Sequence, residues 1–247
     1  MQPVLSIQPG TAASSEAWAS HLEAASRAGF RALELPADTP AEHISQAGQQ
    51  GLRIAALRST LSVPGAADDA CSVQPRAPRP DPLVQVIERA ETLECRLLTV
   101  TPRRDPVTSC DAYHLQYPEA LRAMLLRLRS LVVPAAACGV ALALECPAQG
   151  FLLSPVECRE FLDLLNAADV GACLQVPAAA RLGWLEDWLG TLGYRMICAR
   201  LGDGGAADIA AAADTLAGTE YMGPAILAGD PQIAGRLAGR LNSDDKM

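Results

Sequence analysis

Short apolar segments alternate with longer amphipathic segments from one end of the chain to the other. The short segments are bounded by Gly, Pro or Asp, which is typical of buried strands. They predict strands at 3–8, 31–36, 53–59, 96–102, 140–146, 171–177, 196–203 and 224–229. The spacing of apolar positions between them predicts helices at 14–29, 40–51, 81–94, 116–138, 154–168, 180–192, 207–219 and 231–241.

This alternation predicts the fold class. Strands that are each followed by a helix favour a parallel sheet closed into a barrel. We therefore predict an α/β protein with a (β/α)8 TIM barrel that spans 1–247 as a single domain. An open doubly wound sheet is the alternative, but no G-x-G-x-x-G follows the first strand. The connections 60–80 and 102–115 follow strands, so we expect them at the face where barrel enzymes place their active sites.

The alternation of side chains along each strand predicts which residues point toward the barrel axis. Apolar positions that suit the helix side leave the other set to face inward. In the third strand this places Ile54, Ala56 and Arg58 inside the barrel. In the seventh strand it places Arg200 inside and Ile197 outside.

Near the carboxyl ends of the strands, the inward positions form a mainly polar layer. Its predicted members are Gln8, Glu34, Arg58, Thr101, Glu145, Gln175, Arg200 and Ala228. The two carboxylates balance the two guanidiniums, and such groups must be paired because an isolated buried charge costs several kcal/mol. Two interpretations stay open. The layer is either a plug of mutual ion pairs or a pocket in which arginine holds an anionic group and glutamate holds hydroxyls.

Composition narrows the classes of partner. Lys and Arg number 20 against 28 Asp and Glu, which gives a formal net charge of −8. An acidic chain without a basic stripe is a poor candidate for binding nucleic acid or an anionic membrane. No apolar run reaches the ~18 residues of a membrane span, and the first residues do not resemble a signal peptide, so we expect a cytoplasmic protein. The eight cysteines are scattered without C-x-x-C spacing, which favours buried, reduced thiols.

Five segments, taken in order, resemble the xylose isomerase-like family of sugar phosphate isomerases and epimerases. They read GFRALELP, GLRIAALRS, ACGVALALECP, GYRMICARLGD and YMGPAILAG, and together they span nearly the whole chain. The resemblance implies a TIM barrel that moves a proton beside a sugar carbonyl. An endonuclease relative would need a cluster of His and carboxylates and a basic face, and this chain has only three histidines.

Members of that family usually hold one divalent metal with Glu, Asp, His and Glu from four strands, a set that suits Mn²⁺, Mg²⁺ or Zn²⁺. The resemblance places the first Glu at Glu145, the Asp at Gln175, the His at Arg200 and the last Glu at Ala228. Gln175 can offer a neutral oxygen, but a guanidinium has no lone pair to give. We therefore expect no metal and no cofactor, although Asp203 of the family's His-x-x-Asp pattern is retained.

These substitutions lead to two hypotheses, and a third is that the chain is a structural or partner-binding barrel. In the first, a pair of Glu145 with Arg200 fills the metal position, and the chain is non-catalytic or binds a small polyol, sugar or sugar acid. The ligand-binding residues would then be Glu34, Arg58, Gln175, Arg200 and Asp203. In the second, the chain is a metal-independent isomerase or epimerase, with Glu145 as the catalytic carboxylate, Glu34 as a second base and Arg200 as the oxyanion stabiliser.

The remaining candidate residues lie outside the predicted strands. His21 and His43 fall inside predicted helices and His114 in a connection, so none of them follows a strand. Trp184 and Trp188 are spaced i, i+4 in the predicted helix 180–192. They are expected to pack on the barrel or to form a dimer patch, which keeps a homo-oligomer open.

Overall fold

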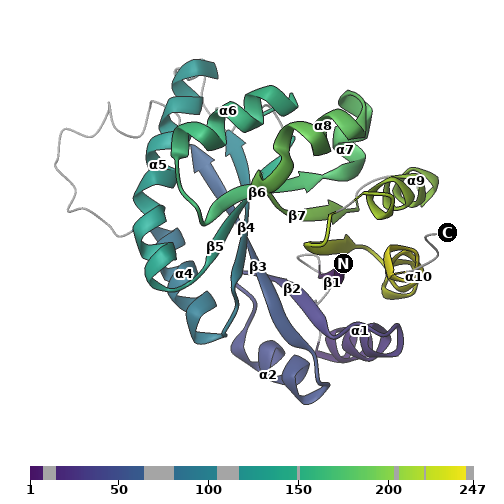
Figure 1. The fold of residues 1–247 in the computed structure, drawn as a ribbon. Coiled ribbons are helices and arrows are strands. Elements are labelled where there is room, and N and C mark those ends of the chain that lie inside the picture. Colours follow the sequence, from purple (N-terminus) through teal and green to yellow (C-terminus); the bar gives the residue numbers. More distant parts are fainter. Residues whose placement is uncertain are drawn as a thin grey trace, which may run out of the picture.

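A computed structural model describes residues 1–7, 15–63, 81–104, 117–148, 151–202, 206–219 and 221–242. Within these residues, eight parallel strands close into a barrel in chain order, and helices surround it (Figure 1). The last strand pairs with the first, with Ser6 beside Ala228. The predicted (β/α)8 TIM barrel is confirmed.

The strands agree with the predicted segments to within a few residues. They are β1 (Gln2–Ser6), β2 (Ala32–Pro36), β3 (Arg53–Val63), β4 (Leu97–Arg104), β5 (Ala141–Cys146), β6 (Val170–Gln175), β7 (Met196–Leu201) and β8 (Pro224–Ala228). The helices are α1 (Ser15–Arg27), α2 (Ala41–Gln49), α4 (Pro82–Thr92), α5 (Tyr117–Ala137), α6 (Pro155–Leu165), α7 (Val176–Leu182), α8 (Leu185–Leu192), α9 (Ala206–Ala217) and α10 (Pro231–Asn242). A 3₁₀ turn, η1 (Gly193–Arg195), leads into β7.

Two helices begin at side-chain caps that the sequence supplies. Asp81 accepts a hydrogen bond from the backbone N–H of Leu83 at the start of α4, and Ser154 accepts one from Glu157 at the start of α6. In both helices a proline follows the cap, where its missing N–H costs nothing. These caps fix where the chain turns back over the barrel wall.

The predicted helix 180–192 is wrong in its bounds, because the structure has two short helices there. The helix α7 begins directly after β6 and ends at Gly183, and α8 starts after Trp184. Trp184 has extended backbone geometry and is 77% exposed, whereas Trp188 is 1% exposed. The two tryptophans therefore do not share a helix face, since only Trp188 packs in the core.

The strands β3 and β4 extend further than predicted. Ser62 pairs with Arg103 and Val63 with Arg104, so the two strands continue together beyond the region paired with β5. The beginning of the connection predicted at 60–80 is therefore strand, while 64–80 lies outside the described residues. This extension, residues 60–63 with 101–104, forms a raised wall on one side of the barrel mouth.

Two apolar layers flank the strands. The larger layer lies between strands and helices. The smaller layer fills the barrel interior with one buried side chain from each strand: Val4, Ala32, Ala56, Leu97, Ala143, Cys173, Cys198 and Ile226. Small side chains suit the narrow interior of an eight-stranded barrel. The polar layer lies beyond this inner ring, toward the carboxyl ends of the strands.

The inward and outward assignment fails next to two β-bulges. Leu33 pairs with Ile54 and Glu34 with Ala56, so β3 carries one extra residue, and Ile54 packs with the outer core instead of pointing inward. A second shift between Ala172 and Cys173 brings Ile197 against the inner ring, although it was predicted to face outward. A β-bulge adds one residue to a strand. The residues before the bulge therefore face the opposite side from the one that simple alternation predicts.

Most of the cysteines that the structure describes are buried. Among the described residues, five free cysteines are buried: Cys95, Cys146, Cys158, Cys173 and Cys198. The free Cys138 is partly buried. No helix in the described ranges has the length and apolar character needed to cross a bilayer.

Candidate functional site

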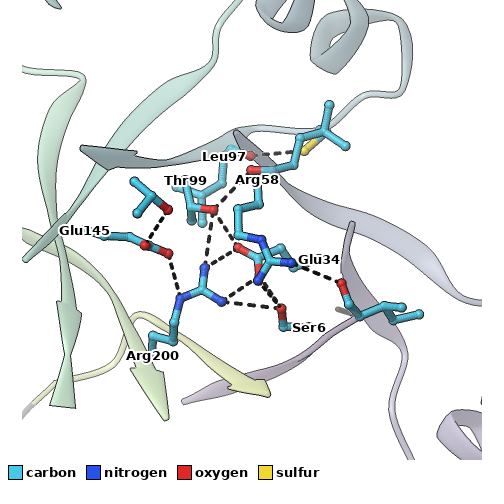
Figure 2. A network of polar contacts seen from close by, with 11 residues as sticks. Ser6, Glu34, Arg58, Leu97, Thr99, Glu145 and Arg200 are labelled. Carbon is cyan, nitrogen blue, oxygen red and sulfur yellow. Dashed lines mark hydrogen bonds and ion pairs between the residues drawn. The ribbon is translucent and has the colours of Figure 1, made fainter. Parts of the chain in front are cut away.

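A network of polar side chains lies at the barrel mouth, above the inner ring (Figure 2). Figure 2 shows the guanidinium of Arg200, from β7, between the carboxylates of Glu34, from β2, and Glu145, from β5. The three strands are separated around the barrel, so the network crosses its interior. Arg58 reaches in from β3 on the far side of Glu34.

Arg200 and Glu34 form a bidentate ion pair in the interior. Arg200 Nη1 donates to Glu34 Oε2 at 2.8 Å, and Nη2 donates to Oε1 at 2.6 Å. The two side chains are 2% and 0% exposed. Paired parallel hydrogen bonds of this kind are among the strongest side-chain contacts in proteins.

Glu34 is saturated by further donors. The hydroxyl of Ser6 donates to Oε2 at 2.5 Å, and that of Thr99 donates to Oε1 at 2.6 Å. Burial by itself raises the pKa of Glu34, but the charge and hydrogen bonds of Arg200, the charge of Arg58 and the Ser6 hydroxyl outweigh it and lower the pKa to about 2. Glu34 is therefore ionised throughout the physiological range.

Glu145 completes the pairing of Arg200. Arg200 Nε lies 2.9 Å from Glu145 Oε1, but its N–H does not point at that oxygen closely enough to form a hydrogen bond, so the contact is an ion pair. The Thr101 hydroxyl donates to Glu145 Oε2 at 2.6 Å. The nearby carboxylates raise the pKa of Arg200 further above its ordinary value despite the opposing effect of burial. The predicted pair of Glu145 with Arg200 is present, and Glu34 is the second carboxylate that Arg200 contacts.

Arg58 differs from Arg200 in its partners. Its Nη1 lies 3.4 Å from the Ser6 hydroxyl and its Nη2 lies 3.3 Å from the carbonyl oxygen of Ile7. Both acceptors are neutral, both contacts are long, and the side chain is half-buried. Within the described residues, no carboxylate lies within ion-pair distance of Arg58.

Gln175 and Ala228, which were also predicted to face inward, make no side-chain hydrogen bond or ion pair with this network in the described part of the chain. Gln175 ends β6 beside Arg200 in the sheet register and makes no capping bond to α7. Ala228 ends β8 and packs closely on Gly202. A Cβ added at Gly202 would lie 2.6 Å from the Ala228 methyl. Gln8 and Asp203 lie outside the described residues.

The histidines whose placement is described serve packing roles. The ring of His43 stacks on Trp18 with centroids 4.8 Å apart. Burial lowers the pKa of His21, an effect that the nearby Asp230 opposes. In the part of the chain that the structure describes, no three His, Cys, Asp or Glu side chains form a group that could hold a metal.

The structure adds two features that the sequence reasoning missed. Ser6 and Thr99 were not among the predicted site residues, although Ser6 lies two residues before Gln8 and Thr99 two residues before Thr101 of the predicted polar layer. A pocket of about 390 Å³ also lies at the mouth beside β2, β3 and β4. It is lined by Pro36, Ala37, Asp38, Arg58, Ser59, Thr60 and Thr101, and we call it the rim pocket.

Comparison with known proteins identifies the fold. No protein-family model and no curated protein matches the chain. Among solved structures, it is similar to a D-psicose 3-epimerase from Clostridium cellulolyticum H10, with a TM-score of 0.65, 15% identity and coverage of 98% of this chain and 96% of that one. A xylose isomerase-like TIM barrel protein from Mycobacterium smegmatis, in complex with magnesium, has a TM-score of 0.68, 12% identity and coverage of 97% and 95%. The fold is that of the xylose isomerase-like TIM barrels.

The solved structures that share this fold also include an endonuclease. An AP endonuclease of family 2 from Brucella melitensis aligns with a TM-score of 0.62 and 14% identity over 95% of this chain and 96% of that one. At such identities the likeness concerns the fold alone. The function of this barrel must therefore be argued from the side chains at its own mouth.

Proposed function

We propose that this chain is a sugar isomerase- or epimerase-like barrel that binds a small polyol, sugar or sugar acid at its mouth and has no metal-dependent catalytic centre. One observation carries the proposal. The guanidinium of Arg200 lies within 2.6 to 2.9 Å of carboxylate oxygens on both Glu34 and Glu145. A permanent cation thus holds the position at which the family resemblance predicts a metal-binding histidine.

The residues present do not fit a divalent metal. Glu145 is the one carboxylate at the four positions that the resemblance assigns to the metal, and its charge is already neutralised by Arg200. A second cation beside Arg200 would be repelled by it, and a guanidinium has no lone pair to donate. Gln175 adds a single neutral oxygen, and Ala228 adds none. No catalytic step through a metal follows from this set.

The same contacts argue against proton transfer by these carboxylates. A general base needs a reachable lone pair and a pKa near the working pH. Glu34 is 0% exposed, accepts four hydrogen bonds and has its pKa lowered to about 2. The position opposite Glu145, where the resemblance predicts a second carboxylate, holds Ala228. The metal-independent isomerase that uses Glu145, Glu34 and Arg200 is therefore the weaker candidate.

Two observations support a sugar-type ligand. The rim pocket combines a guanidinium, a carboxylate and several hydroxyls, which are the groups that recognise polar, hydroxylated molecules. The solved structures that share the fold include sugar epimerases bound to ketoses, among them the psicose epimerase with D-tagatose. We expect no nucleic-acid ligand, given the net charge of −8.

The proposal is tested by proton exchange and binding on the same protein. The chelator-treated chain is incubated in D₂O with D-fructose, D-tagatose or D-psicose, with and without added Mn²⁺ or Mg²⁺. We expect no deuterium at carbon beyond the buffer control, and equal results for Glu145→Gln and the exposed control Glu23→Gln. Ligand-observed NMR on the same samples should show sugar binding.

Three outcomes would overturn the proposal. Exchange that requires metal and is lost in Glu145→Gln would restore the metal-dependent enzyme. Exchange that is unchanged by the chelator and is lost in Glu145→Gln would favour the metal-independent enzyme. Absence of binding to every sugar, polyol and sugar acid tested would remove the binding role.

A further inference from the structure

We propose that the rim pocket binds a sugar acid, with Arg58 holding its carboxylate and Asp38 accepting hydrogen bonds from its hydroxyls. The inference rests on the proposed function, because it names the ligand class for the same barrel mouth. The pocket volume of about 390 Å³ falls within the ~300–1,000 Å³ range of small-molecule sites. Its residues come from the end of β2, the middle of β3 and the raised part of β4.

Arg58 is the guanidinium that remains available to a ligand. Its contacts with the Ser6 hydroxyl and the Ile7 carbonyl are 3.4 and 3.3 Å long, and neither acceptor is charged. Arg200, by contrast, is already shared by two carboxylates. A planar guanidinium that lines a pocket and makes no ion pair with a carboxylate of the described residues suits the two oxygens of a ligand carboxylate.

Hydroxyl and carboxylate groups line the rim pocket together with Arg58. Thr60, two residues further along β3, pairs in register with Thr101 of β4. Thr101 gives its proton to Glu145, so its oxygen is left to accept a hydrogen bond from a ligand hydroxyl. Asp38 is exposed and also lines the pocket, so its carboxylate can accept hydrogen bonds from neighbouring hydroxyls of a polyol.

Four hydrogen bonds hold the wall that carries Asp38. The backbone N–H of Ala37 donates to the carbonyl oxygen of Arg58 at 2.9 Å. The Thr39 hydroxyl donates to the Pro36 carbonyl at 2.7 Å. From α4, Arg89 donates to the carbonyl oxygens of both Ala37 and Thr39. A loop fixed in this way needs little ordering when a ligand binds.

The wall formed by β3 and β4 is held by a second arginine. Arg127 of α5 makes a bidentate pair with Asp81, at 2.8 and 3.0 Å, and also donates to the carbonyl oxygen of Ser62. This ties the end of β3 to the start of α4. Both sides of the rim pocket are thus fixed by buried or half-buried arginines that do not enter it.

Charge favours a carboxylate over a phosphate at Arg58. Among the described residues of the polar network and the rim pocket, the acidic side chains are Glu34, Glu145 and Asp38, and the guanidiniums are those of Arg58 and Arg200. A phosphate monoester carries nearly two negative charges at neutral pH and would meet stronger repulsion than a monoanion. The expected ligand is therefore a polyhydroxy monocarboxylate.

The test compares two molecules that differ in one group. D-gluconate and D-glucitol are six-carbon polyols that end in a carboxylate and a hydroxymethyl group, respectively. Isothermal titration of the full chain should give about tenfold or greater preference for gluconate. Arg58→Met should abolish that preference and leave glucitol binding within about threefold. Arg58→Lys should keep part of it.

A matched control comes from a second surface pocket. A groove of about 390 Å³ between α1 and α10 also contains two arginines, Arg27 and Arg236. Arg236→Met should leave both affinities unchanged, because that groove lies outside the barrel mouth. Circular dichroism confirms that each variant is folded before its affinity is compared.

Each result decides the inference. Equal affinity for gluconate and glucitol, or a preference that survives Arg58→Met, would overturn the sugar-acid assignment while the proposed binding function stands. Tighter binding of D-glucose 6-phosphate than of gluconate would assign the pocket to phosphate esters instead. Binding of none of the three probes would overturn the inference, and the ketose measurements above would then decide the proposed function separately.

Discussion

Two arginines at the same barrel mouth have opposite surroundings. Arg200 is 2% exposed and is shared by two carboxylates at 2.6 and 2.9 Å. Arg58 is half-buried, and among the described residues it reaches a hydroxyl and a carbonyl oxygen, at 3.4 and 3.3 Å. The number of carboxylates within reach decides which guanidinium stabilises the barrel and which is available to a ligand.

The largest expected effect is the loss of Arg200. Arg200→Met leaves Glu34 and Glu145 buried without their shared cation, and we expect it to lower the free energy of unfolding by about 3–5 kcal/mol. Arg58→Met should cost less, about 1–2 kcal/mol, since it removes two long hydrogen bonds and a charge that acts on Glu34 from beyond ion-pair distance. Urea unfolding of both variants measures the difference, and Arg200→Lys should fall between them. Similar losses for Met at positions 58 and 200 would contradict the contrast.

Acid should weaken the ion pair between Arg200 and Glu34. The pKa of Glu34 is about 2 in the fold, below its ordinary value of 4.5. Its contribution is therefore fully present above pH 4.5 and is lost as the pH falls toward 2, by a total on the order of 3 kcal/mol. The difference in unfolding free energy between the wild type and Glu34→Gln, measured from pH 6 downward, should shrink over this window. A constant difference would show that the Glu34 charge does not stabilise the fold.

The two carboxylates that share Arg200 should not be equivalent. Glu34 accepts four hydrogen bonds, whereas Glu145 accepts one from Thr101 and makes one ion pair. At neutral pH, we expect Glu145→Gln to cost about 1–2 kcal/mol and Glu34→Gln more than that. Thermal or chemical unfolding under identical conditions ranks the two. The reverse order would place the main partner of Arg200 at Glu145.

The smallest expected effect concerns the threonines that border the rim pocket. Thr101→Val removes the donor to Glu145 and should cost about 1 kcal/mol. Thr60→Val, at its register partner on the exposed wall, should change stability by about 0.5 kcal/mol or less. Thr101→Ser keeps the hydroxyl and serves as the control. Equal effects of Val at both positions would show that the Thr101 hydroxyl does not support Glu145.

Strand parity was enough to predict the inward side chains that carry charge. Glu34, Arg58, Glu145 and Arg200 all reach the mouth, as the alternation along β2, β3, β5 and β7 indicated. The pattern could not predict which carboxylate each guanidinium takes. That choice depends on how strands are staggered around the barrel, and the stagger placed Glu34 within reach of both Nη atoms of Arg200.

Bulges and strand length were the other limits of the sequence. Ile54 and Ile197 were assigned to the wrong faces because each precedes a register shift that no local pattern marks. The rim pocket was missed because residues 60–63 read as the start of a polar connection. They are strand in the structure, since pairing with 101–104 and the bond from Arg127 to the Ser62 carbonyl hold them.

We infer that Arg200 takes the position of a metal at the barrel mouth. Electron paramagnetic resonance of Mn²⁺ added to the chelator-treated chain tests it most directly, because only unbound Mn²⁺ gives the sharp six-line signal. We expect that signal to equal the total Mn²⁺ added, both for the wild type and for Glu145→Gln. Loss of the signal at one equivalent in the wild type, restored in Glu145→Gln, would contradict the account.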